Sequence, residues 1–308
     1  MVRQPSLLRS SLVRALPFVI LGALPAGCVV SSANNSRYVE REEKRFSVDG
    51  KPDVKLLTRD GSIEIRSWDR QEVQVVVEKR AFSKQGAAAI EVTSSQDGNR
   101  VSVEVKLPRE NGEKLFGLFW GGNARLIVSL PATSNIQALT GDGSIDLEGV
   151  SGEISLRSGD GSIRARRASG TVAARSGDGS IRLDDVNGAI EANTSDGSIG
   201  VTGALTALRA RSGDGSIAIH ARDGSTTGAD WDVSSGDGSL VVEVPEGFGA
   251  ELDARTGDGG IHLDGVTLSN VAGDFSRNHR NGRMGDGGRA MRLRTGDGSI
   301  TVRRISAR

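Results

Sequence analysis

Apolar and polar residues alternate in short runs that recur from about residue 46 to the C-terminus. Three and five positions after a recurrent Asp-Gly pair stand apolar residues, as at Ile163 and Ala165. Six and four positions before the same aspartate stands a second apolar pair, here Ile154 and Leu156. Because a period of two is typical of a strand with one buried face, each unit predicts two short strands.

Between the two strands of each unit lies the phrase Asp-Gly-(Ser/Gly)-(Ile/Leu). It begins at Asp60, Asp142, Asp160, Asp178, Asp196, Asp214, Asp237, Asp258 and Asp297. The spacing is 18 residues from Asp142 to Asp214, and the later steps of 23, 21 and 39 read as repeats with inserted loops. Glycine tolerates positive φ and aspartate bonds its own backbone, so Gly-Asp-Gly predicts a sharp turn. A second turn is predicted near Gly152, Gly170, Gly188 and Gly203.

A fixed period of this length indicates a repeat architecture. The predicted fold is all-β: a single β-solenoid, similar to a β-helix or β-roll, with coils of about 18 residues and two short strands per coil. Stacked coils would pair strand to strand at about 4.8 Å, so residues of equal phase would form ladders. An unrepeated β-sandwich is the alternative.

The domain prediction has three parts. Residues 1–27 form a signal peptide, residues 28–45 a flexible tether, and residues 46–308 the solenoid. Within the solenoid, 46–139 are an irregular cap with the first coils, and 140–308 are the regular repeats. A loop insert at about 265–290 accounts for the longest step between aspartates.

The N-terminal segment has the features of an export signal. Arg3, Arg9 and Arg14 precede the apolar run ALPFVILGAL, which at about ten residues is shorter than the ~20 that span a membrane. The following LPAGC resembles the lipobox of bacterial lipoproteins and makes Cys28 the predicted lipidation site, although Pro25 stands where leucine is usual. Ordinary cleavage nearby is the alternative. Val29 and Val30 are not the aspartate that commonly retains lipoproteins at an inner membrane, which favours the outer membrane in a cell with two.

Composition narrows the function. Lys and Arg total 39 and Asp and Glu total 39, so no global charge points to nucleic acid as a partner. One cysteine excludes an intrachain disulfide framework. The chain has three histidines, no G-x-S-x-G and no H-E-x-x-H. We therefore predict no enzyme activity, no cofactor and no catalytic residues; a polysaccharide-cleaving β-helix enzyme is the least favoured alternative.

The segments SIEIRSWDRQEVQV and ARLIVSLPATSNIQALTGDGSIDLEGVSGEI resemble the bacterial putative-adhesin β-solenoid family of unknown function. The resemblance covers about residues 46–308 and rests on the Gly-Asp-Gly-Ser-Ile phrase and the second turn. It implies a secreted, lipidated or membrane-tethered envelope protein, and it carries no catalytic motif. Relatives that neighbour envelope-stress signalling systems imply an alternative regulatory or sensory role.

The repeat aspartates are the sharpest candidate site. Asp142, Asp160, Asp178, Asp196, Asp214, Asp237, Asp258 and Asp297 would form a ladder at the turns. Closely spaced carboxylates raise one another's pKa or attract cations, but one Asp per coil is poor in the six to eight oxygens that calcium prefers. We interpret the ladder as turn structure and predict no metal site, with a cation ladder as the weaker reading. Arginines three residues before the aspartates are expected either to neutralise them or, as outward strand residues, to be solvated: Arg157, Arg175, Arg211, Arg255 and Arg294.

Two irregular segments offer further candidates. Phe116, Phe119 and Trp120 cluster in a chain with only 4% aromatic residues, either as a contact patch or as part of the cap. The insert contains His279 and nearby arginines, and is expected to be a solvated loop or a contact for anionic lipid or polysaccharide.

These observations predict a non-catalytic, surface-tethered scaffold of the cell envelope. Its partner would be an envelope protein, a polysaccharide or another surface, with the membrane reached through the lipid anchor. The alternative is a regulatory module that binds a membrane protein in a stress response.

Overall fold

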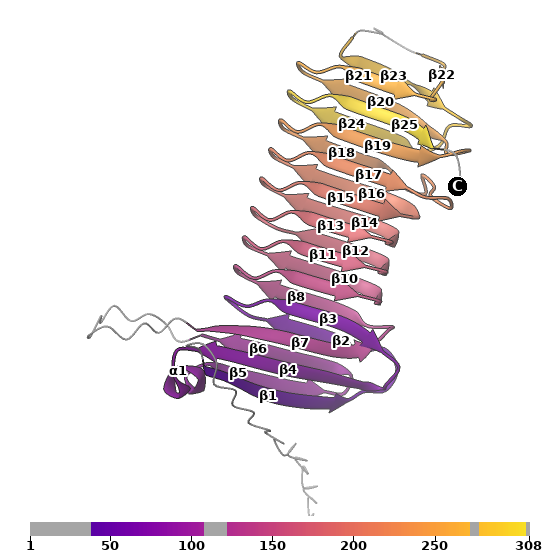
Figure 1. Cartoon of the computed structure of the whole chain (residues 1–308). Coiled ribbons are helices and arrows are strands. Elements are labelled where there is room, and N and C mark those ends of the chain that lie inside the picture. The colour runs from indigo at the N-terminus through magenta and orange to yellow at the C-terminus, as the bar shows by residue number, and fades with distance from the viewer. Residues whose placement is uncertain (1–37, 108–121, 272–276, 306–308) are drawn as a thin grey trace, which may run out of the picture.

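The computed structural model describes residues 38–107, 122–271 and 277–305. These residues form a long stack of β-coils in which two sheets run side by side along the stack axis (Figure 1). The predicted all-β solenoid is confirmed. In the described residues one short helix, α1 (Lys84–Ala88), lies beside the N-terminal end of the stack.

The first sheet, sheet A, has twelve strands in the described residues. In spatial order they are β1 (Tyr38–Ser47), β4 (Glu72–Ala81), β7 (Asn123–Pro131), β3 (Ile63–Trp68), β9 (Ile145–Glu148), β11 (Ile163–Arg166), β13 (Ile181–Asp184), β15 (Ile199–Gly203), β17 (Ile217–Ala221), β19 (Leu240–Pro245), β25 (Ile300–Ile305) and β21 (Ile261–Asp264).

The second sheet, sheet B, has thirteen strands in the same ranges. In spatial order they are β22 (Leu268–Ser269), β23 (His279–Met284), β20 (Ala250–Thr256), β24 (Ala290–Thr295), β18 (Trp231–Ser235), β16 (Leu205–Ser212), β14 (Asn187–Thr194), β12 (Ser169–Arg175), β10 (Ser151–Ser158), β8 (Asn135–Thr140), β2 (Asp53–Leu57), β6 (Arg100–Lys106) and β5 (Glu91–Asp97).

The regular coils pair in parallel and in the phase that the repeat predicts. Ile163 of β11 lies between Ile145 of β9 and Ile181 of β13, and the same register holds along both sheets. The inward residues of each strand are almost completely buried, as Ile163 and Ala174 show. The core is therefore one narrow apolar column enclosed by the two sheets.

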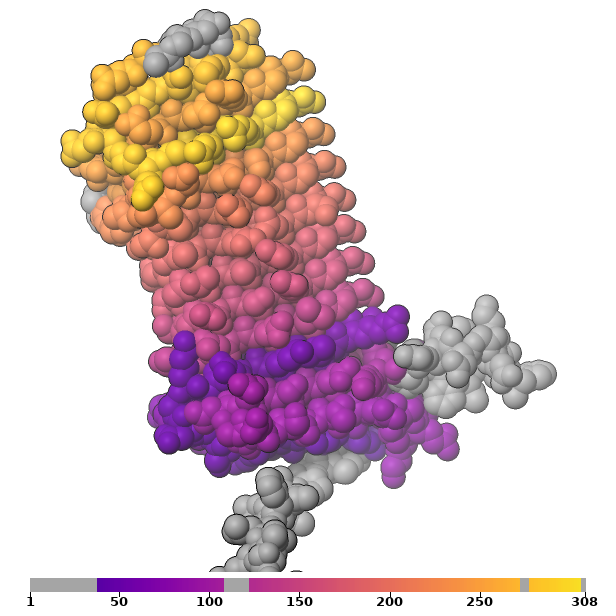
Figure 2. Space-filling model, turned by 180° about the vertical axis from the view of Figure 1, so that it is seen from behind, coloured from indigo at the N-terminus to yellow at the C-terminus, as the bar shows by residue number. Residues whose placement is uncertain are grey.

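The C-terminal coil does not lie at the end of the stack. Strands β24 and β25 are inserted between the coil of β18 and β19 and the coil of β20 and β21. Figures 1 and 2 show the yellow C-terminal strands enclosed by orange ones on both sides. The order of coils in the stack therefore differs from their order in the chain, because one coil position is left open and is filled by the last coil.

The N-terminal end is interleaved in the same way. The coil of β2 and β3 lies between the coil of β8 and β9 and the pair β6 and β7. The chain thus passes over its own first coil when it runs from β7 to β8. Residues 53–68, assigned from the sequence to the irregular cap, are in register with the regular repeats.

Part of the expected tether is folded. Residues 38–45 belong to β1, which pairs antiparallel with β4 from Tyr38–Ala81 to Ser47–Glu72. The prediction of a flexible segment over 28–45 is wrong for these residues, because their charges are used in ion pairs. Lys79 of β4 contacts Glu42 at 2.9 Å, and Glu78 contacts Arg41 at 2.6 Å.

These ion pairs hold β1 at the edge of the sheet. Burial opposes the ionisation of Glu42, but its bonds to Lys79 and Lys44 outweigh that effect and leave its pKa below the ordinary 4.5. Burial likewise opposes the ionisation of Glu78, yet Arg41 and Arg80 lower its pKa below 4.5. A charged outer strand also protects the stack from pairing with other chains.

The insert near the C-terminus is also ordered in part. Residues 279–284 form β23, which pairs antiparallel with β20, and β22 pairs with β23. The prediction of a solvated loop is wrong for these residues. His279 and Arg283 reach acidic residues of β20: His279 bonds Asp253 at 3.2 Å and Arg283 bonds Glu251 at 3.0 Å.

The glycines of the Gly-Asp-Gly corner are needed for space and not for positive φ. A Cβ on Gly161 would lie 2.2 Å from the carbonyl oxygen of Gly143 in the preceding coil. The corner glycines do not adopt positive φ, so that sequence expectation is wrong. It holds at the second turn, where Gly170 has φ +104°.

The close approach at the corner predicts the effect of a single methyl group. Gly161→Ala should lower the free energy of unfolding by about 1–3 kcal/mol, because the added Cβ overlaps backbone that cannot move aside. Gly200→Ala is the matched control, since a Cβ there meets nothing within 4 Å. It should be neutral or stabilise by up to about 1 kcal/mol. Urea unfolding measures both, and equal losses in the two variants would contradict the steric explanation.

The ion pairs of β1 predict acid sensitivity. Since the folded-state pKa values of Glu42 and Glu78 are lowered, their stabilisation is complete above the unfolded value of 4.5 and is lost as pH falls through the folded values. The hydrogen-exchange protection factors of residues 38–47, taken relative to the intrinsic rate at each pH, should fall between about pH 5 and 3, before those of the central coils fall. Glu42→Gln should weaken this pH dependence, whereas Glu91→Gln on exposed β5 should leave it unchanged. Simultaneous exchange of β1 and the central coils would contradict the prediction.

Candidate functional site

The structure brings the predicted aspartates together at one corner of the stack, where sheet B strands end and sheet A strands begin. The corner backbones bond directly to one another: the Gly159 N–H donates to Gly141 O at 2.6 Å and the Gly177 N–H to Gly159 O at 2.5 Å. The carboxylates point outward and are exposed in every coil. We call this column of aspartates the corner ladder.

The order of the corner ladder follows the stack and not the chain. Asp297 lies between Asp237 and Asp258, because the C-terminal coil is inserted there: the Asp297 N–H donates to Gly236 O, and the Asp258 N–H to Gly296 O. At the other end Asp60 joins the ladder beside Asp142. Burial raises the pKa of Asp60, and the nearby charge of Asp142 raises it further.

The geometry of the corner ladder offers single carboxylates to solvent. In the described ranges no three His, Cys, Asp or Glu side chains converge on a common point. Each coil contributes one carboxylate, whereas a calcium ion prefers six to eight oxygens. The corner ladder therefore presents a row of negative charge to solvent.

The expected neutralisation by arginines is wrong for most of these residues. They lie on the outward face of sheet B and pair with carboxylates of that face: Arg175 with Glu191, Arg211 with Asp232, and both Arg255 and Arg294 with Asp253. Arg157 makes no ion pair within the described residues. The reason is strand alternation, because a side chain three residues before the corner projects from the sheet face.

A column of buried hydroxyls, which the sequence reasoning missed, links the coils behind the corner ladder. The Ser176 hydroxyl donates to Gly161 O of the preceding coil at 2.9 Å and accepts from the Gly179 N–H at 3.1 Å. The available signal was a Ser or Thr two residues before each aspartate. Its members are Thr140, Ser158, Ser176, Thr194, Ser212, Ser235, Thr256 and Thr295, all buried.

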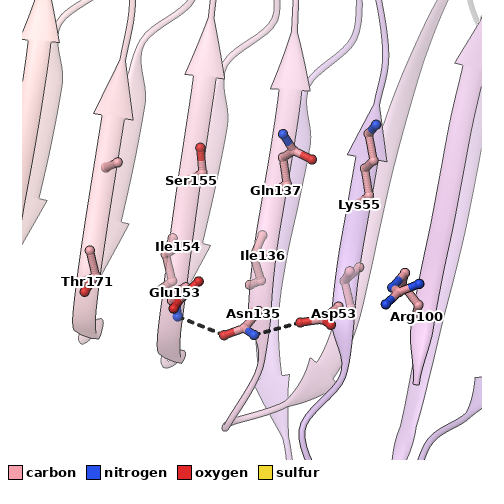
Figure 3. Close-up of a pocket in the computed structure, with 12 residues that line it drawn as sticks. Asp53, Lys55, Arg100, Asn135, Ile136, Gln137, Glu153, Ile154, Ser155 and Thr171 are labelled. Atoms are coloured by element: carbon pink, nitrogen blue, oxygen red, sulfur yellow. Dashed lines mark hydrogen bonds between the residues drawn. The ribbon is translucent and has the colours of Figure 1, made fainter. Parts of the chain in front are cut away.

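A shallow groove lies on the outward face of sheet B, near the N-terminal end of the stack (Figure 3). It has a volume of about 480 Å³ and extends over β6, β2, β8, β10 and β12. Asp53, Asn135, Glu153 and Thr171 form one row across the strands. A second row contains Lys55, Gln137 and Ser155, and the strand register places Ala173 beside Ser155.

Hydrogen bonds fix part of the first row. The Asn135 side chain donates to Asp53 Oδ1 at 2.7 Å, and its carbonyl accepts from the Glu153 N–H at 3.0 Å. Asn135 thus bridges three adjacent strands, as Figure 3 shows. The small side chains Ser155 and Ala173 leave the hollow between this row and the longer residues around it.

The other predicted site residues lie outside the described part of the chain. These are the lipidation site Cys28 and the contact patch of Phe116, Phe119 and Trp120. In the described part, no helix is both long enough and apolar enough to cross a membrane.

The fold and its corners define a class of protein, a β-solenoid whose coils stack through Gly-Asp-Gly turns. Residues 53–303 match the profile of the Toastrack DUF4097 family, and the chain belongs to this family. The resemblance stated from the sequence is thereby confirmed. No protein of curated function matches the chain.

The solved structures that match the chain include proteins from several bacteria. A putative adhesin from Bacteroides fragilis is 11% identical, with 86% of this chain and 97% of that one covered and a TM-score of 0.43. A putative cell adhesion protein from Clostridium sporogenes is 12% identical, with 87% and 100% covered and a TM-score of 0.28. A putative lipid binding protein from Parabacteroides distasonis is 10% identical, with 85% and 96% covered and a TM-score of 0.29.

The hydroxyl column predicts a specific loss. Ser176→Ala should lower the free energy of unfolding by about 1–3 kcal/mol, because it leaves Gly161 O and the Gly179 N–H buried without their partner. Ser176→Thr should retain the wild-type free energy of unfolding, since Thr194 makes the same bonds in the next coil. Ser180→Ala, at an exposed corner position, should change it by less than about 0.5 kcal/mol. Urea unfolding measures the free energy of unfolding of these variants. Equal effects of Ser176→Ala and Ser180→Ala would contradict the role of the hydroxyl column.

Proposed function

We propose that the protein is a non-catalytic scaffold of the cell envelope whose outward sheet faces bind a surface or another envelope component. The observation that carries this proposal is that inward, corner and outward residues have separate roles in each coil. Inward residues fill the core, and corner glycines and hydroxyls join the coils. The outward rows add only partly exposed ion pairs between coils, so two long regular faces are left for contact with a partner.

The charges of these faces support binding more than catalysis. On sheet A, Arg164 pairs with Asp146, and Arg166 with Glu148 on the neighbouring strand. Such ion pairs between adjacent coils cancel charge locally and give a flat, ordered surface. Exposed pairs of this kind stabilise a fold only slightly, by about 0–1 kcal/mol each.

His220 comes nearest to a catalytic arrangement and still lacks its context. Its Nδ1 lies 2.5 Å from Glu243 Oε2, and Thr202 is the strand neighbour on the other side. The three residues project from the open face of sheet A, whereas the groove lies on sheet B. A nucleophilic centre needs an enclosed pocket and an oxyanion site around such a pair. We therefore assign His220 to the outward ion pairs of sheet A.

The proposed anchor determines how the scaffold would stand on the cell. Cys28 precedes Tyr38, the first residue of β1, by ten residues (38 − 28), which reach about 35 Å at most. Strand β1 lies at the N-terminal end of the stack. Lipid on Cys28 would hold that end near the membrane and direct the C-terminal coils away from it. We place the anchor in the outer membrane where the cell has two membranes.

One set of strains tests the anchor and the binding role together. The wild-type protein should incorporate a fatty-acid label and sediment with membranes, and Cys28→Ser should lose both properties, because the thiol is the acylation site. Deletion of the protein should reduce attachment of cells to surfaces. Cys28→Ser should reduce it similarly, since the scaffold is then released from the cell.

The same strains separate the alternatives. Membrane association of Cys28→Ser equal to that of the wild type would overturn the lipid anchor. Unchanged attachment after deletion, with altered expression of stress-response genes, would favour the regulatory alternative over the scaffold.

A further inference from the structure

The groove on sheet B has a composition that specifies the chemistry of its occupant. We infer that it binds an uncharged, extended polysaccharide that lies along the stack axis. This inference rests on the proposed scaffold function and names a partner class for one of its faces. It is carried by the charge balance of the groove, its hydrogen-bonding groups and its direction.

The charged side chains of the groove cancel. Asp53 and Glu153 carry negative charge, and Lys55 and Arg100 carry positive charge, so the lining has no net charge. A polyanion such as nucleic acid or an acidic glycan would meet as many carboxylates as cations. Binding of a polyanion depends on an excess of cations and on counterion release, which this lining does not provide.

The remaining polar groups suit hydroxyl-rich ligands. Asn135 and Gln137 offer amides, and Ser155 and Thr171 offer hydroxyls. Amides and hydroxyls both donate and accept hydrogen bonds, as sugar hydroxyls do. Gln137 and Thr171 are exposed, so their polar groups are open to a ligand. Ala173, two residues after Thr171 on β12, adds a small apolar area to the same face.

The direction of the groove favours a chain over a single sugar. Its lining comes from five adjacent strands, which at a spacing of about 4.8 Å span about 19 Å along the stack. Its volume of about 480 Å³ is in the range of binding pockets, about 300–1,000 Å³. The two rows cross β2, β8, β10 and β12 in register, so an extended chain along the stack axis can contact each strand in turn.

A peptide fits this surface less well. Extended peptides commonly bind by adding a strand to a free sheet edge. Here β2, β8, β10 and β12 are paired on both sides, so their backbone groups are occupied. A ligand can therefore bind only to the side chains of the groove, as a hydroxyl-rich chain does.

Binding of defined oligosaccharides to the folded protein tests the inference. The ligands are uncharged β-1,4-linked hexasaccharides of glucose and of N-acetylglucosamine, with polygalacturonate as the acidic comparison. Calorimetry should detect at least one uncharged hexasaccharide. Its affinity should change little between about 0.05 and 0.5 M salt, because no charge is neutralised.

Two arginine substitutions separate the groove from the rest of the surface. Ala173→Arg fills the hollow from an outward position and should weaken binding by at least about tenfold. Ala218→Arg adds the same side chain on the outward face of sheet A and should leave the affinity unchanged. Both variants should keep the melting temperature of the wild type, since neither residue is in the core.

Three results would overturn the inference. The first is no binding of either uncharged hexasaccharide at about 10 mM, where a Kd of 1 mM would be evident. The second is equal affinity of Ala173→Arg and the wild type. The third is binding of polygalacturonate alone, with a steep salt dependence. The cell-attachment assay keeps the two proposals distinguishable. If the wild-type protein binds neither hexasaccharide while deletion of the protein still reduces attachment, the groove is rejected and the scaffold is retained.

Discussion

The close approach of backbones at the Gly-Asp-Gly corner is the constraint on which the rest of the molecule depends. A corner Cβ would lie little more than 2 Å from the carbonyl of the preceding coil, as at Gly161 and Gly179. This spacing places the Ser or Thr hydroxyl behind the corner within reach of two backbone groups from neighbouring turns. It also sets the parallel register of both sheets, so the buried isoleucine column follows from the same contact. The aspartate is exposed, and glycine takes the most crowded position directly after it.

The same constraint explains how far the sequence could predict the fold. The period, the two strands per coil and the aligned corners follow from local residues that every coil repeats. The order of coils at the two ends could not be derived, because the inserted coil of β24 and β25 has the same inward pattern as any other. Stacking energy is nearly the same for every neighbour of equal phase, and loop lengths decide which coil is placed where. Strand β1 was not predicted because its charged residues were interpreted as solvated, whereas they form ion pairs with β4.

The candidate sites were harder to predict than the fold, for a related reason. An arginine three residues before the corner is near the aspartate in sequence, but strand alternation turns it onto the sheet face. Arg175 therefore finds Glu191 in the next coil, 16 residues away in the chain. The groove likewise combines Lys55 with Arg100 and Ser155, which become neighbours only when β2 lies between β6 and β8. No local motif marks such a site, since it depends on the interleaved order of coils.

The interleaving and the position of the groove are connected. The groove begins where the first coil is enclosed by β6 on one side and β8 on the other, so its charged end, Lys55 and Arg100, is built by the chain crossing over itself. Its other end is built by regular coils, whose small outward residues Ser155 and Ala173 lower the surface. A regular repeat alone would present a uniform face, and the cap alone would present a short one. The junction of the two supplies both a hollow and a direction, which distinguishes this part of sheet B from the uniform faces of the regular coils.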